Sequence, residues 1–242
     1  MHDLPAKEQD TLKRAAADSA AALVESGMVV GLGSGSTAAF AVSALAHRVR
    51  AGLRMVGIPT SEQTAREART QGIPLTTWAE HARIDITIDG ADEIELVSLS
   101  LIKGHGGALL REKIVATAST RLVIVADETK LVERLGRKTT IPVEVIPFGW
   151  EVTARRLEDA GAKTALRRAD GDQPFLSDGG HLILDCMFPT EASSEALAEA
   201  LDRTVGVVEH GLFLGMTSEA HVAHSAGVRV LRAAGTRRGD RD

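Results

Sequence analysis

Acidic side chains and a lysine gather in two short stretches near the middle of the chain. Asp89-Gly90-Ala91-Asp92-Glu93 places three acids directly after an apolar run, and Lys103 opens the glycine-rich stretch Lys103-Gly104-His105-Gly106-Gly107. Open α/β sheets place their ligands at the carboxyl ends of their strands. Carboxylates and an ammonium group there can move protons and offset a developing negative charge. A turn capped by Asp would also explain the first stretch.

A further acid, Glu112, lies on the helix predicted to follow Lys103. A glutamate on a helix is usually solvated, so Glu112 alone would carry no functional prediction. Its neighbour Lys113 is predicted to point to another face of the helix, as a surface charge. Combined with the two preceding stretches, however, Glu112 becomes a candidate base for proton transfer.

The segment Gly31-Leu32-Gly33-Ser34-Gly35-Ser36-Thr37 joins a predicted strand to a predicted helix. Free backbone N–H groups at such a junction bind anions. The dinucleotide fingerprint would need glycine at position 36, which is Ser, and a Walker loop would need a Lys after its last glycine. The hydroxyls of Ser34, Ser36 and Thr37 therefore predict a site for one phosphate or carboxylate, with a plain tight turn as the alternative.

Composition narrows the function classes. The 242 residues include 28 Lys and Arg against 33 Asp and Glu, a formal charge of -5, and only 3 % aromatic residues, which disfavours nucleic-acid binding. No apolar run reaches the roughly 20 residues of a membrane span. The single cysteine, Cys186, is predicted in the core and indicates a reducing, cytoplasmic setting. His221 and His224 are three residues apart and could share a helix face, but no Cys or acidic partner joins them locally, so placement at the surface is favoured over a metal site.

Strand-like and helix-like patterns alternate along the first half of the chain. They predict strands at 28–30, 53–58, 73–76, 84–88 and 122–126, and helices at 10–25, 38–42, 61–71 and 108–119. This alternation predicts an α/β fold with a mainly parallel, Rossmann-like sheet covered by helices.

The pattern changes near residue 140. Strands are predicted at 141–147, 164–168, 182–187 and 207–214, with helices at 150–159 and 193–203. The order strand, helix, strand, strand, helix, strand matches a ferredoxin-like split βαβ unit. We therefore expect a Rossmann-like catalytic domain of residues 1–139 and 216–242, and a smaller α+β domain of residues 140–215 that acts as a lid or an interface. The last residues, 235–242, are predicted to be a solvated tail.

Several blocks, in this order, resemble the A type of ribose-5-phosphate isomerase. These blocks are 33–37, 89–94, 103–113, 142–147 and 206–213, and the likeness extends from about residue 10 to 232. The resemblance implies interconversion of D-ribose 5-phosphate and D-ribulose 5-phosphate through an enediolate, in the non-oxidative pentose phosphate pathway. It implies no cofactor and no metal, and it implies at least a homodimer.

The resemblance also implies roles for individual residues. Glu112 corresponds to the proton-abstracting carboxylate, and Asp89, Asp92 and Lys103 correspond to a polar cluster that orients hydroxyls, relays protons and offsets oxyanion charge. The substrate-binding residues that it implies are Ser34, Gly35, Ser36, Thr37, Asp89, Gly90, Ala91, Asp92, Lys103, Gly104, His105, Gly106, Lys130 and, as a weaker match, Lys13.

Two positions depart from the family pattern. His105 stands where many relatives have Gly, and its ring either contacts the substrate or lines the rim of the site, the second being favoured. The segment 93–99 lacks the expected turn residues, which predicts a different loop shape. Two rival functions stay open: another sugar-phosphate enzyme on a similar scaffold, such as a deaminase or lactonase, and a non-enzymatic phosphosugar-sensing module. The presence of Glu112 favours the isomerase.

Overall fold

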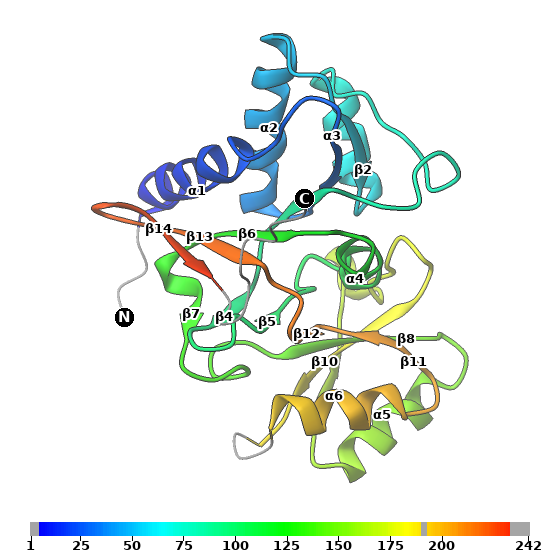
Figure 1. Cartoon of the computed structure of the whole chain (residues 1–242). Coiled ribbons are helices and arrows are strands. Elements are labelled where there is room, and N and C mark those ends of the chain that lie inside the picture. The colour runs from blue at the N-terminus through cyan, green and yellow to red at the C-terminus, as the bar shows by residue number, and fades with distance from the viewer. Residues whose placement is uncertain (1–4, 190–192, 233–242) are drawn as a thin grey trace, which may run out of the picture.

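The computed structural model describes residues 5–189 and 193–232, and its centre is a six-stranded sheet (Figure 1). Neighbouring strands run parallel except for the antiparallel hairpin of the last two. In spatial order the strands are β14 (Gly227–Arg232), β13 (Glu219–His224), β6 (Leu122–Asp127), β3 (Ile86–Asp89), β1 (Val29–Leu32) and β2 (Val56–Pro59). The mainly parallel sheet predicted from the sequence is thereby confirmed.

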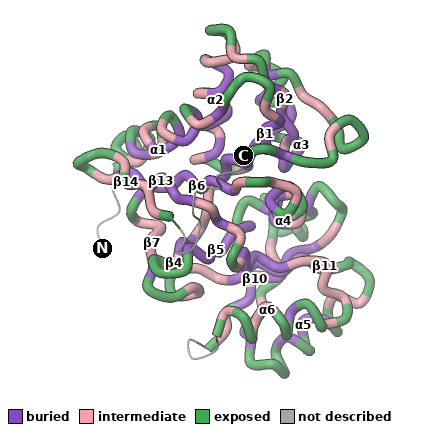
Figure 2. The backbone as a smooth tube through the Cα atoms, in the orientation of Figure 1, coloured by how far each residue is buried: buried purple, intermediate pink, exposed green. Residues whose placement is uncertain are grey.

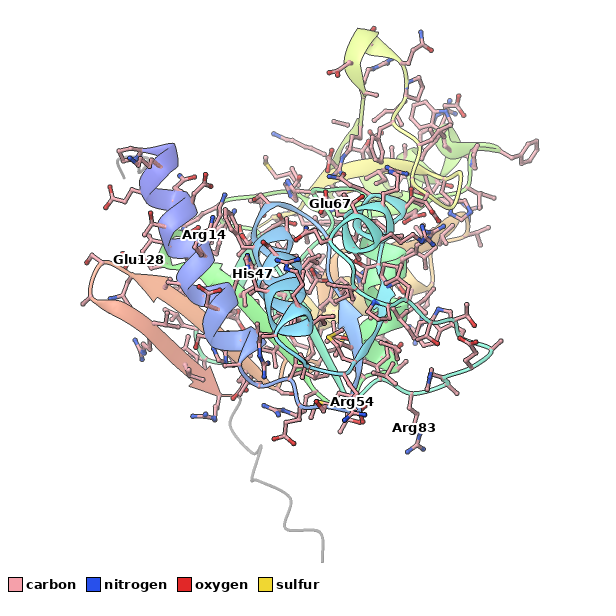
Figure 3. The ribbon with its side chains drawn as sticks, turned by 90° about the horizontal axis from the view of Figure 1, so that it is seen from above. Arg14, His47, Arg54, Glu67, Arg83 and Glu128 are labelled. Atoms are coloured by element: carbon pink, nitrogen blue, oxygen red, sulfur yellow. The ribbon has the colours of Figure 1, made fainter. Side chains whose placement is uncertain are left out.

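Helices cover both faces of this sheet. On one face lie α1 (Ala6–Ala21) and α2 (Ser36–Arg50), marked in Figure 3 by Arg14 and His47, with α3 (Glu62–Thr70) beside α2. On the other face lies α4 (Leu109–Thr117). Because both faces are covered, every residue of β6 is buried, as its apolar sequence requires (Figure 2). Across the described ranges, no helix has the length and apolar character needed to cross a membrane.

A second, antiparallel sheet follows along the chain and has two helices on one face (Figure 1). Its strands, in spatial order, are β11 (Val207–His210), β8 (Ile141–Val145), β10 (Leu182–Met187) and β9 (Lys163–Leu166), and its helices are α5 (Trp150–Asp159) and α6 (Ser194–Asp202). Val143 and Val145 pack with Leu157 of α5 and Leu201 of α6. This strand order is that of the split βαβ unit, so the predicted smaller α+β unit is confirmed as a fold element.

A third sheet, of very short strands, lies between the other two and was not predicted. It consists of β12 (Leu212–Phe213), β5 (Leu101–Ile102), β4 (Glu93–Glu95) and β7 (Leu131–Val132). The single strand predicted over 207–214 is therefore wrong: the chain passes from the second sheet to the third at Gly211. A Cβ atom at Gly211 would lie 2.2 Å from the Lys103 carbonyl oxygen, so only glycine allows this close approach.

Other differences from the predictions are local. Helix α1 begins and ends about four residues before its predicted bounds, and residues 73–76 form one bridge, between Leu75 and Gly57, instead of a strand. His221 and His224 lie on strand β13 and not on a helix, because this segment pairs with β6 on one side and β14 on the other. His221 is buried there, so its expected placement at the surface is wrong. Two short 3-10 helices occupy Glu128–Lys130 and Asp170–Asp172. The predicted tail, 235–242, lies outside the described residues.

Candidate active site

Three charged side chains from three different elements meet in the interior, at the carboxyl edge of the central sheet. Asp89 ends β3, Lys103 follows β5, and Glu112 lies in the first turn of α4. The Lys103 Nζ atom is 2.9 Å from Asp89 Oδ2 and 3.4 Å from Glu112 Oε2. All three are at least 94 % buried as side chains, so the ammonium and the carboxylates depend on one another for stabilisation.

Asp89 pairs with Lys103 and also holds the anion-binding loop, residues 33–37, in place. Its Oδ1 accepts the backbone N–H groups of Ser34, at 3.1 Å, and of Gly90, at 2.7 Å. Residue 33 must be glycine, because a Cβ atom there would lie 2.2 Å from Asp89 Oδ1. Lys103 in turn donates to the Gly90 carbonyl at 2.6 Å. The first glycine-rich loop and the acidic block are thus fixed against each other.

Glu112 is the less satisfied of the two carboxylates. Its Oε2 atom is buried and has no hydrogen-bond partner among the residues described. Burial raises the pKa of Glu112 to about 8, with Lys103 opposing the shift and Asp89 and Asp92 adding to it. Burial by itself would lower the pKa of Lys103, but the neighbouring carboxylates of Asp89 and Glu112 outweigh it and raise that pKa. A carboxyl group that titrates near neutral pH is suited to accept and return a proton.

A cavity of about 260 Å³ opens onto these groups. Of the sequence-predicted residues, the lining includes Lys13, Ser34, Gly35, Ser36, Thr37, Gly90, Ala91, Asp92, Lys103, Gly104, Gly106, Glu112 and Lys130. Two predicted residues lie elsewhere. Asp89 is buried behind Lys103, and His105 is exposed and donates from Nε2 to the Thr140 carbonyl at 3.0 Å. The favoured interpretation of His105 as a rim residue agrees with this contact.

One end of the cavity presents hydroxyl and ammonium groups suited to an anion. Helix α2 begins at Ser36, so its first N–H groups point toward the loop. Lys13 on α1 donates to Ser36 Oγ at 3.2 Å. Lys130 reaches the same cavity from the short 3-10 helix after β6. Two flexible lysines and a helix start can hold one phosphate group, and Glu112 and Lys103 line the same cavity.

Sequence reasoning missed three residues of the lining: Gln9, Asp127 and Thr129. Asp127 ends β6 at the same sheet edge as Asp89, and its carboxylate accepts the Thr129 N–H at 2.9 Å. The position of Asp127 at the end of an apolar run was the signal that could have found it. Gln9 precedes Lys13 by one helical turn and shares its face of α1.

Lys113 is not the surface charge that was predicted. Its Nζ donates to Glu209 Oε1 at 2.6 Å and to the His210 carbonyl at 2.7 Å, because α4 packs against β11 as well as the central sheet. Asp202, Glu209 and His210 bring together three groups of metal-ligating type. The Lys113 ammonium already lies against Glu209, in the place that a cation would take.

The atypical segment after the acidic block has a clear structural role. Glu93 is fully buried, and its carboxylate accepts three backbone N–H groups, from Gly136 at 2.7 Å, Lys138 at 2.6 Å and Thr139 at 2.7 Å. Residues 93–95 form β4, and a turn follows at once. The segment therefore anchors the 133–139 loop.

Comparisons with known proteins agree with this geometry. The family model of ribose 5-phosphate isomerase A (phosphoriboisomerase A) matches residues 56–227. A ribose-5-phosphate isomerase A of Gloeobacter violaceus is 63 % identical over 222 residues, 92 % of this chain and 96 % of that protein. One from a Synechococcus species is 56 % identical, over 92 % of this chain and 97 % of that protein.

Solved structures give the same result. Ribose 5-phosphate isomerase A of Methanocaldococcus jannaschii superposes with a TM-score of 0.89 at 39 % identity, covering 93 % of this chain and 99 % of that one. A D-ribose-5-phosphate isomerase in complex with phospho-erythronic acid also has a TM-score of 0.89, at 35 % identity, over 92 % of this chain and 98 % of that one. The chain therefore belongs to the ribose 5-phosphate isomerase A family and is an aldose–ketose isomerase.

Proposed function

We propose that the cavity converts D-ribose 5-phosphate to D-ribulose 5-phosphate and back, as a step of the non-oxidative pentose phosphate pathway. One observation carries this proposal: Glu112 lines the cavity, and its Oε2, which has no hydrogen-bond partner among the described residues, lies 3.4 Å from the buried ammonium of Lys103. A base next to a fixed positive charge is what an enediolate intermediate requires. The relatives described above are all isomerases, so the deaminase, lactonase and sensor alternatives lose their support.

The reacting end divides the work among four residues. Glu112 takes the proton from C2 of the opened aldose and returns it to C1, which yields the ketose. Lys103 offsets the negative charge that develops on the enediolate oxygens, and Asp89 holds Lys103 in place at 2.9 Å. Asp92, which lines the cavity, relays a proton between O1 and O2. These steps balance without a cofactor or a metal ion.

The other end holds the phosphate. Helix α2 offers its free N–H groups, Ser34, Ser36 and Thr37 offer hydroxyls, and Lys13 and Lys130 supply positive charge. Binding energy at this non-reacting group can orient the sugar for proton transfer at the other end. The small cavity suits a pentose phosphate.

We further propose the division into a catalytic domain, 1–139 with 216–242, and a smaller domain, 140–215. A homodimer is part of the same proposal, and the exposed apolar side chains of Ile146, Phe148 and Val205 support it, since Ile146 and Gly206 are hydrogen-bonded neighbours. Sedimentation equilibrium measures the assembly directly. A cytoplasmic location is supported by the one cysteine of the chain, Cys186, which is buried and free.

The direct test is ketose formation from D-ribose 5-phosphate by the purified protein in the presence of a chelator. We expect full turnover after prolonged treatment with the chelator. Turnover that disappears on chelation and returns with a divalent cation would overturn the proposed mechanism. Failure to form ketose under any condition would overturn the proposed function itself.

A further inference from the structure

Arg167 lies outside the cavity but contacts the back of the loop that follows Lys103. Its Nη1 atom donates to the carbonyls of Gly104, at 2.8 Å, and His105, at 3.0 Å. Gly104 lines the cavity, whereas Arg167 does not. The side chain is only 12 % exposed and comes from the residue directly after β9, in the second sheet. A largely enclosed cation next to the second sheet therefore fixes the backbone of the site.

Asp185 on β10 holds the Arg167 guanidinium in place. Its Oδ2 atom accepts from Nε at 2.9 Å, and its Oδ1 atom accepts from Nη2. This two-pronged pairing uses one edge of the planar guanidinium and directs the remaining nitrogen at the loop carbonyls. A lysine in place of Arg167 could not make both sets of contacts at once.

The loop held by Arg167 in turn contacts Asp92, a residue of the reacting end. The His105 N–H donates to Asp92 Oδ2 at 3.0 Å, while the His105 carbonyl accepts from Arg167. The His105 ring also donates to the carbonyl of Thr140, the residue directly before β8, and so ties His105 to that strand. Asp92 lines the cavity, so displacement of this one residue would disturb both the loop and the Asp92 carboxylate.

We propose that Arg167, held by Asp185, is a positioning residue for the isomerisation. It fixes the Gly104 and His105 peptides, and through them the placement of Lys103 and Asp92 against the sugar. The inference rests on the proposed function of the cavity. The phosphate end is built on α1, α2 and the 3-10 helix after β6. Within the described ranges Arg167 forms no hydrogen bond or ion pair with these elements, so we expect its effect at the reacting end.

The test compares Arg167→Met with Arg168→Met. Arg168 is the adjacent residue and is exposed, and among the described residues its side chain pairs with the Asp172 carboxylate and carbonyl alone. For Arg167→Met we expect kcat to fall about 10- to 100-fold, because a displacement of about 1 Å at the reacting groups has that effect, while KM changes less than about threefold. Arg168→Met should leave both constants unchanged.

Two further variants separate positioning from folding. In Arg167→Ala, added methylguanidinium at concentrations well below denaturing ones should restore part of kcat without affecting the wild type. Asp185→Asn should lower kcat by a smaller factor, about threefold, and should add little to Arg167→Met, since the two residues act as one unit.

Each outcome decides the matter. If Arg167→Met keeps the kcat of Arg168→Met per folded molecule and only its thermal midpoint falls, the ion pair is a stabilising contact of the second sheet and the inference is wrong. The inference is also wrong if the loss lies in KM alone. Absence of turnover in the wild type would instead refute the proposed function, so the two failures are distinguishable. If Arg167→Met does not fold, the methylguanidinium response of Arg167→Ala and the kcat of Asp185→Asn give the answer.

Discussion

Glu93 and Glu112 are both buried glutamates near the carboxyl edge of the central sheet, but their surroundings differ. Three backbone N–H groups donate to Glu93, at 2.6 to 2.7 Å, and tie down a distant loop. Glu112 has Lys103 at 3.4 Å and an oxygen without a hydrogen-bond donor among the described residues. The carboxylate with a full set of donors organises structure, and the carboxylate that lacks them faces a cavity.

This difference gives a physical criterion for separating a structural acid from a reactive one. A buried carboxylate that is fully hydrogen-bonded cannot accept a substrate proton without breaking those bonds, each of which stabilises it. A buried carboxylate with an open oxygen is costly to ionise, and the folded protein maintains it only because other contacts compensate. Removing the carboxylate at each of the two positions in turn is therefore the direct way to test the comparison.

The largest effect is expected from Glu112→Gln. Gln keeps the shape of Glu112 but cannot take up a proton, so kcat should fall by about 10²- to 10⁴-fold, the usual contribution of a positioned base. Near pH 7 the free energy of unfolding should change little, since Glu112, with its pKa raised to about 8, is mostly uncharged there. Turnover assays and denaturant titrations check both quantities. Retention of more than a tenth of wild-type kcat would assign the base elsewhere.

The pH dependence should reflect Glu112 in the free enzyme. The base acts in its ionised form, and its pKa is raised to about 8, so kcat/KM should rise with pH and level off above that value. Between pH 6.5 and pH 9 the rise should be roughly 30-fold for a single group of this pKa. Initial rates at low substrate concentration measure it. A kcat/KM that is flat across this range would contradict the assigned environment of Glu112.

A smaller effect is expected at the phosphate end. Lys13→Met removes one positive charge near Ser36 and should raise KM about tenfold with little change in kcat, because a charge-assisted hydrogen bond to the phosphate is lost in ground and transition states alike. Lys7→Met, an exposed position on the same helix, is the matched control and should change neither constant. A fall in kcat at unchanged KM for Lys13→Met would place Lys13 in the chemical step.

The smallest effect on catalysis is expected from Glu93→Gln. Loss of the carboxylate weakens three hydrogen bonds and leaves an amide group against backbone donors, so the free energy of unfolding should fall by about 2 kcal/mol or more. The kcat of folded molecules should stay within about twofold of wild type, since Glu93 does not line the cavity. A large loss of kcat without a loss of stability would remove the distinction between the two glutamates.

Short-range patterns explain why much of the site was predictable. The loop 33–37, the block around Asp89 and the stretch that begins with Lys103 are each a short continuous run of residues, so each can be recognised locally. The strands that precede them bring the three runs together at one edge of the site. The split βαβ unit was predictable because its strands have 4 to 6 residues and its helices 9 or 10, long enough to show periodicity.

The remaining features depend on contacts between distant residues. The third sheet has strands of two or three residues, too short for any periodicity. The N–H groups that donate to Glu93 lie 43 to 46 residues away in the chain. The partners of Lys113, Glu209 and His210, follow it by 96 and 97 residues. The contact of Arg167 with Gly104 spans 63 residues. No local pattern reveals such pairs.

Hydrogen exchange during turnover tests the assignment of Glu112 most directly. The reaction is run in deuterated water, and deuterium at C1 of the ketose is measured by NMR for the wild type and for Glu112→Gln, with binding of D-ribose 5-phosphate as the check that the site is intact. We expect deuterium incorporation with the wild type and, with the variant, incorporation no faster than in solution without enzyme. Incorporation at the wild-type rate by a variant that binds the ligand would show that Glu112 is not the base.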